Sequence, residues 1–299
     1  MDTQRGSIWS LLRQTVVNWI DDKAPQLGAA LAFYTALSIA PLLVISLGIA
    51  AFVFGQEAAR GGVQDQMQYL VGDQGAKAIE EMIANANQTG KGVFATSLSL
   101  VILLFGASGV FGQLQQSLNA IWKVQPKPGR GIIGILRDRF LSFVMVLGSA
   151  FLLLVSLLLS AALSSLETLT SRLPESMVWV SQLLHMGVSF IVITLLFAMM
   201  FKYLPDVKIA WRDVWLGAII TAALFTVGKF AIGLYLGHSS MASSYGVAGS
   251  FVVLLVWVYY SAQILFLGAE FTQVHAYQYG RRILPAENAE RISTGPPPA

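Results

Sequence analysis

The sequence predicts an all-α integral membrane protein with six transmembrane helices, preceded by an amphipathic interfacial helix, and with both termini in the cytoplasm. Hydrophobic residues make up 55% of the 299 residues and charged residues 12%, and the mean hydropathy is +0.64. A soluble domain usually carries about 25% charged residues. Several apolar stretches are also long enough to cross a hydrocarbon core of about 30 Å. These observations exclude a water-soluble domain.

The first predicted unit, residues 1–23, is a cytoplasmic helix that lies in the headgroup region of the membrane. Apolar residues recur at Ile8, Leu12, Val16 and Ile20, the spacing of one face of a helix. The segment is too polar to span, so a membrane-parallel anchor is the main interpretation. A gate or docking surface is the alternative.

The second predicted unit, residues 24–280, is a bundle of six spans. The spans lie at about 28–54, 93–112, 140–163, 183–203, 214–236 and 246–271, with an extracytoplasmic helical loop at 55–92. The remaining residues, 281–299, end in GPPPA and are predicted to form a disordered cytoplasmic tail. Pro41 interrupts the first span, where it removes a backbone donor and produces either a kink or a binding site.

The orientation follows from the distribution of Lys and Arg in the short loops. The N-terminal segment, the 113–139 connection, the 202–213 loop and the tail together hold 14 of these residues, and the opposite side holds 4. Both termini are therefore predicted to face the cytoplasm.

The last span carries two different stripes when its residues are placed at about 100° intervals. One stripe is small or aromatic and contains Gly246, Ser250, Trp257, Ser261 and Gly268. The other contains Val252, Val256, Tyr259, Gln263 and Glu270. Small residues allow close helix packing and polar ones avoid lipid, so we expect packing on the first side and a polar lining open to the cytoplasm on the second.

Two ionisable residues fall within the spans, Lys229 and Glu270. At about 1.5 Å of rise per residue they lie about 20 Å apart in depth, too far for an ion pair. Lys229 is either a functional cation or a side chain that snorkels to the outer surface. Glu270 is expected to be a structural anchor near the cytoplasmic edge, beside the cations Arg137, Arg139 or Lys202.

Signatures of catalysis are missing from the sequence. The chain has no cysteine, and its three histidines stand far apart outside any HExxH or HxH pattern. We therefore expect no enzyme activity, no catalytic residues, no metal and no cofactor. The basic 113–139 connection is explained by orientation in an anionic membrane, so no nucleic-acid partner is expected.

Three stretches together resemble the YihY/BrkB family of bacterial inner-membrane proteins. They read AALAFYTALSIAPLL, SGVFGQLQQSLNAIWKVQP, and YLPDVKIAWRDVWLGAIITAALFTVGKFAIGLYL followed by SSYGVAGSFVVLLVWVYYSAQILFLGAEFTQVHA. The resemblance covers about residues 20–280 and implies six spans and a link to serum resistance or, in one branch, to export of lipid A precursors. It includes Tyr34, Pro41, Asn119, Tyr245 and Glu270. The family's old label, ribonuclease BN, is regarded as a misassignment.

The sequence therefore favours a transporter or exporter of an amphiphile, lipid or small solute, linked to the cell envelope. The candidate cavity or transport residues are Tyr34, Ser38, Pro41, Ser108, Asn119, Lys229, Tyr245, Tyr259, Gln263 and Glu270. Scattered interhelical hydrogen bonds are an equally simple explanation of the polar ones. A non-transporting scaffold for envelope biogenesis is the alternative function, and a membrane-bound ribonuclease a remote one. The expected partners are membrane lipids, a lipid or small-molecule substrate, and a second copy of the chain.

Overall fold

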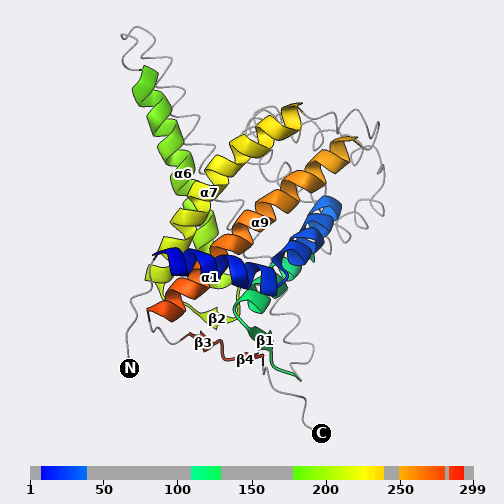
Figure 1. Cartoon of the computed structure of the whole chain (residues 1–299), viewed down its shortest axis with the longest axis vertical. Coiled ribbons are helices and arrows are strands. Elements are labelled where there is room, and N and C mark those ends of the chain that lie inside the picture. The colour runs from blue at the N-terminus through cyan, green and yellow to red at the C-terminus, as the bar shows by residue number, and fades with distance from the viewer. Residues whose placement is uncertain (1–7, 39–108, 129–177, 239–248, 280–282, 293–299) are drawn as a thin grey trace, which may run out of the picture.

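The computed structural model describes residues 8–38, 109–128, 178–238, 249–279 and 283–292 (Figure 1). Its three longest helices are α6 (Val178–Tyr203), α7 (Trp211–His238) and α9 (Gly249–Gln278). All three are long and apolar enough to cross a membrane. They match the last three predicted spans. Most of the first and second predicted spans and all of the third lie outside the described residues.

Helix α1 (Ile8–Asp21) crosses the bundle and packs against α9 (Figure 1). Leu11 and Thr15 are its buried residues, and the Thr15 hydroxyl donates to the carbonyl of Leu11 at 2.9 Å. The predicted apolar face at Ile8, Leu12, Val16 and Ile20 stays exposed. The helix therefore exists as predicted and turns its apolar face away from the protein.

Two further described helical segments, 24–38 and 109–121, contact α9 through Gly28 and Ile121, and a lysine in the left-handed region lies next to one end of each. Lys23 (φ 54°) precedes a helix at 24–38, and Lys123 (φ 55°) follows a helix at 109–121. The amide of Lys123 donates to the carbonyl of Ala120 at 3.1 Å, which closes the last turn of that helix. Both lysines therefore stand where the chain changes direction.

The hydrophobic core lies where these helices meet. Its fully buried large side chains include Leu118 on the helix 109–121, Trp122 directly after that helix, Phe201 on α6 and Leu254 and Phe266 on α9. Within a membrane, van der Waals packing between such side chains holds helices together, because lipid tails are as apolar as the side chains themselves. The core therefore holds α9 in the middle of the described helices.

Helices α7 and α9 approach closely through glycines. A Cβ atom on Gly217 would overlap the Thr272 side chain, and one on Gly268 would overlap Thr221. Each threonine hydroxyl donates to a carbonyl one turn earlier in its own helix, at 2.7 Å in both cases. The small-residue stripe predicted on the last span thus packs against α7 at Gly268.

The segment after residue 282 is ordered, and the prediction of a wholly disordered tail is wrong for residues 283–292. Strand β1 (Val124–Pro126) pairs antiparallel with β4 (Ala289–Arg291), and β2 (Val207–Lys208) pairs antiparallel with β3 (Leu284–Pro285). Strands of two or three residues are too short to show hydrophobic periodicity, and each pairs with a segment far away in the sequence, so the sequence pattern did not predict them. The tail segment thereby ties together the connections after the helix 109–121 and after α6.

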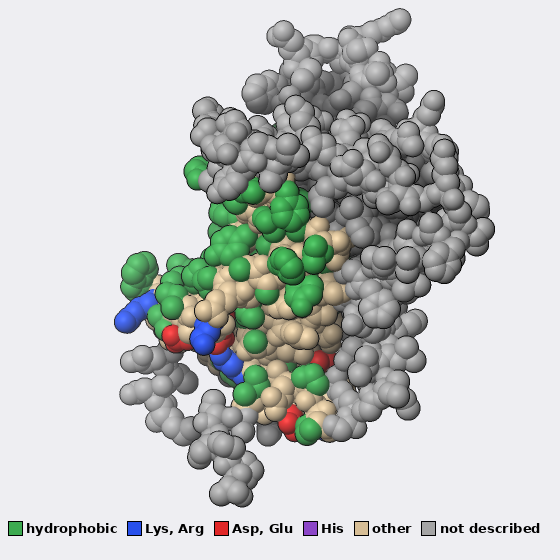
Figure 2. Space-filling view, turned by 90° about the vertical axis from the view of Figure 1, so that its right-hand side faces the viewer, with side chains coloured by type: hydrophobic (Ala, Val, Ile, Leu, Met, Phe, Trp, Pro, Cys, Tyr) green, Lys and Arg blue, Asp and Glu red, His purple; other side chains and the backbone are tan. Residues whose placement is uncertain are grey.

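The described surface divides along the long axis of the molecule. In the face shown in Figure 2, hydrophobic side chains cover the upper part of the described surface and charged side chains gather below them. The strands and α1 lie at this lower end in Figure 1. The end that the distribution of Lys and Arg predicts to face the cytoplasm is the one that carries these charged side chains.

Candidate functional site

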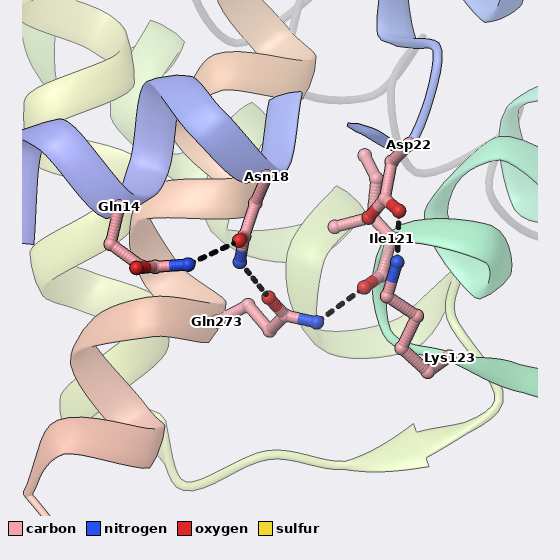
Figure 3. Close-up of polar contacts among 6 residues, drawn as sticks. All are labelled: Gln14, Asn18, Asp22, Ile121, Lys123 and Gln273. Carbon is pink, nitrogen blue, oxygen red and sulfur yellow. Dashed lines mark hydrogen bonds and ion pairs between the residues drawn. The ribbon is translucent and has the colours of Figure 1, made fainter. Parts of the chain in front are cut away.

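A chain of amide side chains joins α1, the C-terminal part of α9 and the end of the helix 109–121 (Figure 3). Gln14 donates from Nε2 to Asn18 Oδ1 at 2.7 Å, and Asn18 donates from Nδ2 to Gln273 Oε1 at 3.3 Å. Gln273 is buried on α9 and donates from Nε2 to the carbonyl of Ile121. This network fixes the inner end of α9 against two other helices.

An ion pair lies beside this network. Lys123 donates from Nζ to Asp22 Oδ1, joining the turn before the helix 24–38 to the turn after the helix 109–121 (Figure 3). The Lys123 side chain is 50% exposed, whereas that of Asp22 is 8% exposed. The second oxygen of Asp22, Oδ2, is buried and has no hydrogen-bond partner within the described structure. The pair is thus open to water mainly on its lysine side.

Glu270 is the most deeply buried charged side chain of the site, one turn before Gln273 on α9. It is 0% exposed, and neither carboxyl oxygen has a hydrogen-bond partner among the described residues. The charged groups that act on it are Asp22, within hydrogen-bonding reach, and Lys123. Carboxylates are seldom buried without a paired cation or a donor, so this one requires an explanation.

Gln263 lies two turns from Glu270 on the same face of α9. Both polar atoms of its side chain are buried without a hydrogen-bond partner in the part of the chain that the structure describes. Its amide packs on Gly28 of the helix 24–38, where a Cβ atom would overlap Nε2. The polar stripe of the last span therefore faces the first predicted span.

Asn119 forms a reciprocal pair with Asp206. Its Nδ2 donates to Asp206 Oδ2 at 2.9 Å, and its Oδ1 accepts the backbone N–H of Asp206 at 2.8 Å. Both residues are buried, and the Asp206 carbonyl accepts the N–H of Ala286 at 2.8 Å. Asn119, predicted as a lining residue, thus links its helix to the loop and tail strand beside α6.

The remaining predicted site residues are dispersed. Lys229 is half-buried with Nζ 5.3 Å from the centre of the Phe230 ring, and it is not among the groups that act on Glu270. Tyr34 and Tyr259 are exposed, and Ser38 is buried. Pro41, Ser108 and Tyr245 lie outside the described residues. The structure thus buries the side-chain polar atoms of Gln263 and Glu270 on one face of α9, whereas Tyr259 of the same stripe is exposed.

Of the three predicted partners of Glu270, the structure describes Lys202, which is engaged elsewhere. Lys202 donates to the carbonyl of Ile209 at 2.5 Å and lies 5.4 Å from the centre of the Trp211 ring. Arg137 and Arg139 are outside the described residues. Among the described residues, Asp22 and Lys123 are the charged groups that act on Glu270. The sequence did not indicate this contact beyond placing both residues at the ends of predicted helices.

No metal site is evident in the described residues, which contain no group of three or more His, Cys, Asp or Glu side chains able to hold a metal ion. A separate pair lies at the same end, where His275 Nδ1 is 3.3 Å from Asp213 Oδ1. His275 also packs between the rings of Phe271 and Tyr279. This pair joins the start of α7 to the end of α9.

Comparison with known proteins places these residues in a family context. Residues 15–293 match the family model described as virulence factor BrkB. The chain is 26% identical over 274 residues to a UPF0761 membrane protein of Psychrobacter sp., covering 88% of this chain and 47% of the relative. A UPF0761 membrane protein of Alkalilimnicola ehrlichii is 29% identical over 260 residues, covering 85% and 56%.

Length varies among these relatives. The chain spans about half the length of several curated relatives, but a UPF0761 membrane protein of Pseudoalteromonas translucida is 26% identical over 284 residues that cover 89% of this chain and 88% of the relative. No solved structure matches the chain.

Proposed function

Because this chain belongs to the BrkB virulence-factor family and is a multi-pass protein of the bacterial cytoplasmic membrane, we propose that it transports an amphiphile, lipid or small solute. The proposed path runs along the face of α9 that carries Gln263 and Glu270. One observation carries the proposal: these two side chains hold four buried polar atoms without hydrogen-bond partners among the described residues.

Buried polar groups without partners are rare because each loses its hydrogen bonds to water. Within a membrane span the cost rises further, and such residues usually face a cavity, a pathway or one another. A solute with hydroxyl, amide or phosphate groups would satisfy the Gln263 amide, which both donates and accepts. The polar face of α9 therefore has the chemistry of a passage for a partly polar molecule.

The position of this face supports a path between the first and last predicted spans. Gly28 allows the helix 24–38 to come into contact with the Gln263 amide. Ala32 and Ala36 are buried further along the same helix. Small side chains let two helices approach closely, so the helix 24–38 forms the wall opposite the polar face of α9 in the proposed path.

The proposal is tested by flux in liposomes containing the purified protein, with fluorescent lipids and labelled small solutes as probes. Gln263→Leu should reduce flux of the active probe about tenfold, the effect of losing about 1.4 kcal/mol of interaction in the rate-limiting state. Gln278→Leu, at the exposed end of the same helix, is the matched control and should transport normally. Absence of flux for every probe class would count against transport.

A non-transporting scaffold for envelope biogenesis is the second candidate. The interlocked Gly–Thr contacts of α7 and α9 and the paired tail strands favour it, because a scaffold needs a fixed shape. A scaffold role predicts that Gln263→Leu leaves cellular envelope integrity intact. Transport predicts that the same variant fails to complement a deletion strain while accumulating to normal levels in the membrane.

A further inference from the structure

The carboxyl groups of Asp22 and Glu270 form a buried pair with too few hydrogen-bond donors. Three of their four oxygens, Asp22 Oδ2 and both oxygens of Glu270, are buried and lack a hydrogen-bond partner in the described structure. The fourth, Asp22 Oδ1, accepts from Lys123. The two carboxyls lie within hydrogen-bonding reach of each other, but an ionised carboxylate only accepts, so two ionised groups cannot bond.

The surrounding charges do not balance two anions. Lys123 supplies one positive charge from a side chain that is half exposed. With both carboxyls ionised, the cluster of Asp22, Glu270 and Lys123 has a net charge of one negative unit. Glu270 is fully buried, so water does not solvate its share of this charge. Two carboxylates that share a buried site usually ionise one at a time, because the second charge is opposed by the first and by the loss of water.

The polar side chains of Gln273, Asp206, His275 and Lys202 near this end of α9 are already engaged, whereas the indole N–H groups of Trp19 and Trp122 are buried without an acceptor in the described structure. Gln273 uses its amide on Ile121 and Asn18, and Asp206 is bound by Asn119. His275 faces Asp213, and Lys202 bonds to Ile209. The described charged groups that act on Glu270 are Asp22, from the turn before the helix 24–38, and Lys123, from the turn after the helix 109–121.

We propose that Asp22 and Glu270 hold one proton between them at neutral pH and form a proton-binding site at the cytoplasmic end of α9. The shared proton makes one carboxyl a donor, so that it bonds to its neighbour and the cluster becomes neutral with Lys123. Protons reach the pair from the cytoplasm past the exposed lysine. Where the proposed transport function also holds, this site couples flux to the proton gradient, and that second step rests on the proposed function.

Infrared difference spectroscopy of the purified protein tests the site directly. At neutral pH the wild type should show the carbonyl band of one buried protonated carboxyl per chain, with a shift in D₂O. Glu270→Gln and Asp22→Asn should each abolish the band, because the new amide donates to the remaining carboxylate. Glu287→Gln, at a side chain that is 91% exposed, is the matched control and should retain it.

Absence of the band in the wild type overturns the proposal. This result does not depend on whether the variants fold. Persistence of the band in both site variants also overturns it, because the proton would then reside on another group. The result is separable from transport. A band without flux in liposomes supports the proton site and contradicts the proposed function, whereas flux without a band does the reverse.

Discussion

Thr272 of α9 occupies the space that a side chain on Gly217 of α7 would need, and Thr221 of α7 occupies the same space beside Gly268 of α9. The two contacts are reciprocal because the helices run antiparallel. Each threonine hydroxyl is bonded within its own helix, so the close approach leaves no polar atom unsatisfied. This contact fixes the depth of α9 relative to α7 and so sets the level of the polar face beyond it.

Gly217→Ala should destabilise the protein by about 1–3 kcal/mol, because the added methyl group overlaps Thr272 and overpacks the helix contact. Thermal unfolding in detergent measures the loss. Gly233→Ala is the matched control on the same helix, since a Cβ atom there meets nothing within 4 Å and alanine is the better helix former. An equal loss in both variants would show that helix packing at Gly217 is not the cause.

Asn119→Ala should cost about 1–3 kcal/mol, because it removes both hydrogen bonds to the buried Asp206. The free energy of unfolding in denaturant measures this cost. A double-mutant cycle with Asp206→Ala isolates the coupling between the two side chains. Additive effects of the two substitutions would contradict the pairing.

Truncation after Arg282 should loosen the connections after the helix 109–121 and after α6, because it removes β3 and β4. Hydrogen exchange of the backbone amides in residues 124–128 and 207–208 should accelerate. Truncation after Ile292 leaves both strand pairs in place and is the control. Unchanged exchange after the longer truncation would show that the strands contribute no protection.

The exposed apolar face of α1 leads to a prediction about lipid contact. Trp9 is 75% exposed on this helix, and the fully packed Trp122 is 2% exposed. In vesicles with brominated lipids, Trp9→Phe should reduce the quenchable part of the tryptophan fluorescence, since interfacial helices place such rings among the headgroups. Trp122→Phe should leave it unchanged. Equal quenchable fractions before and after Trp9→Phe would place α1 in water.

Several features follow from local sequence and needed no tertiary structure. The apolar spacing at Ile8, Leu12, Val16 and Ile20 predicted α1, and the long apolar runs predicted α6, α7 and α9. The small residue at Gly268 also indicated close packing. In each case the signal lies within one helix, because hydropathy and helical periodicity depend on neighbouring residues alone.

The neighbours of Glu270 could not be predicted in this way. Asp22, Lys123 and Glu270 come from three distant segments, and the loop cations Arg137, Arg139 and Lys202 satisfied the same depth argument. The pairing of Asn119 with Asp206 was hidden for the same reason. A charge count in loops gives the side of the membrane but does not select a partner on that side.

By itself, the sequence determined that this chain is a helical membrane protein and where its described spans lie, because the energy of placing a segment in lipid is set by its own composition. Only the tertiary structure decided that Gln263 faces Gly28, that Glu270 lies beside Asp22, and that residues 283–292 pair with two earlier loops. Those relationships depend on helix packing and on backbone pairing between distant segments, which no local pattern encodes.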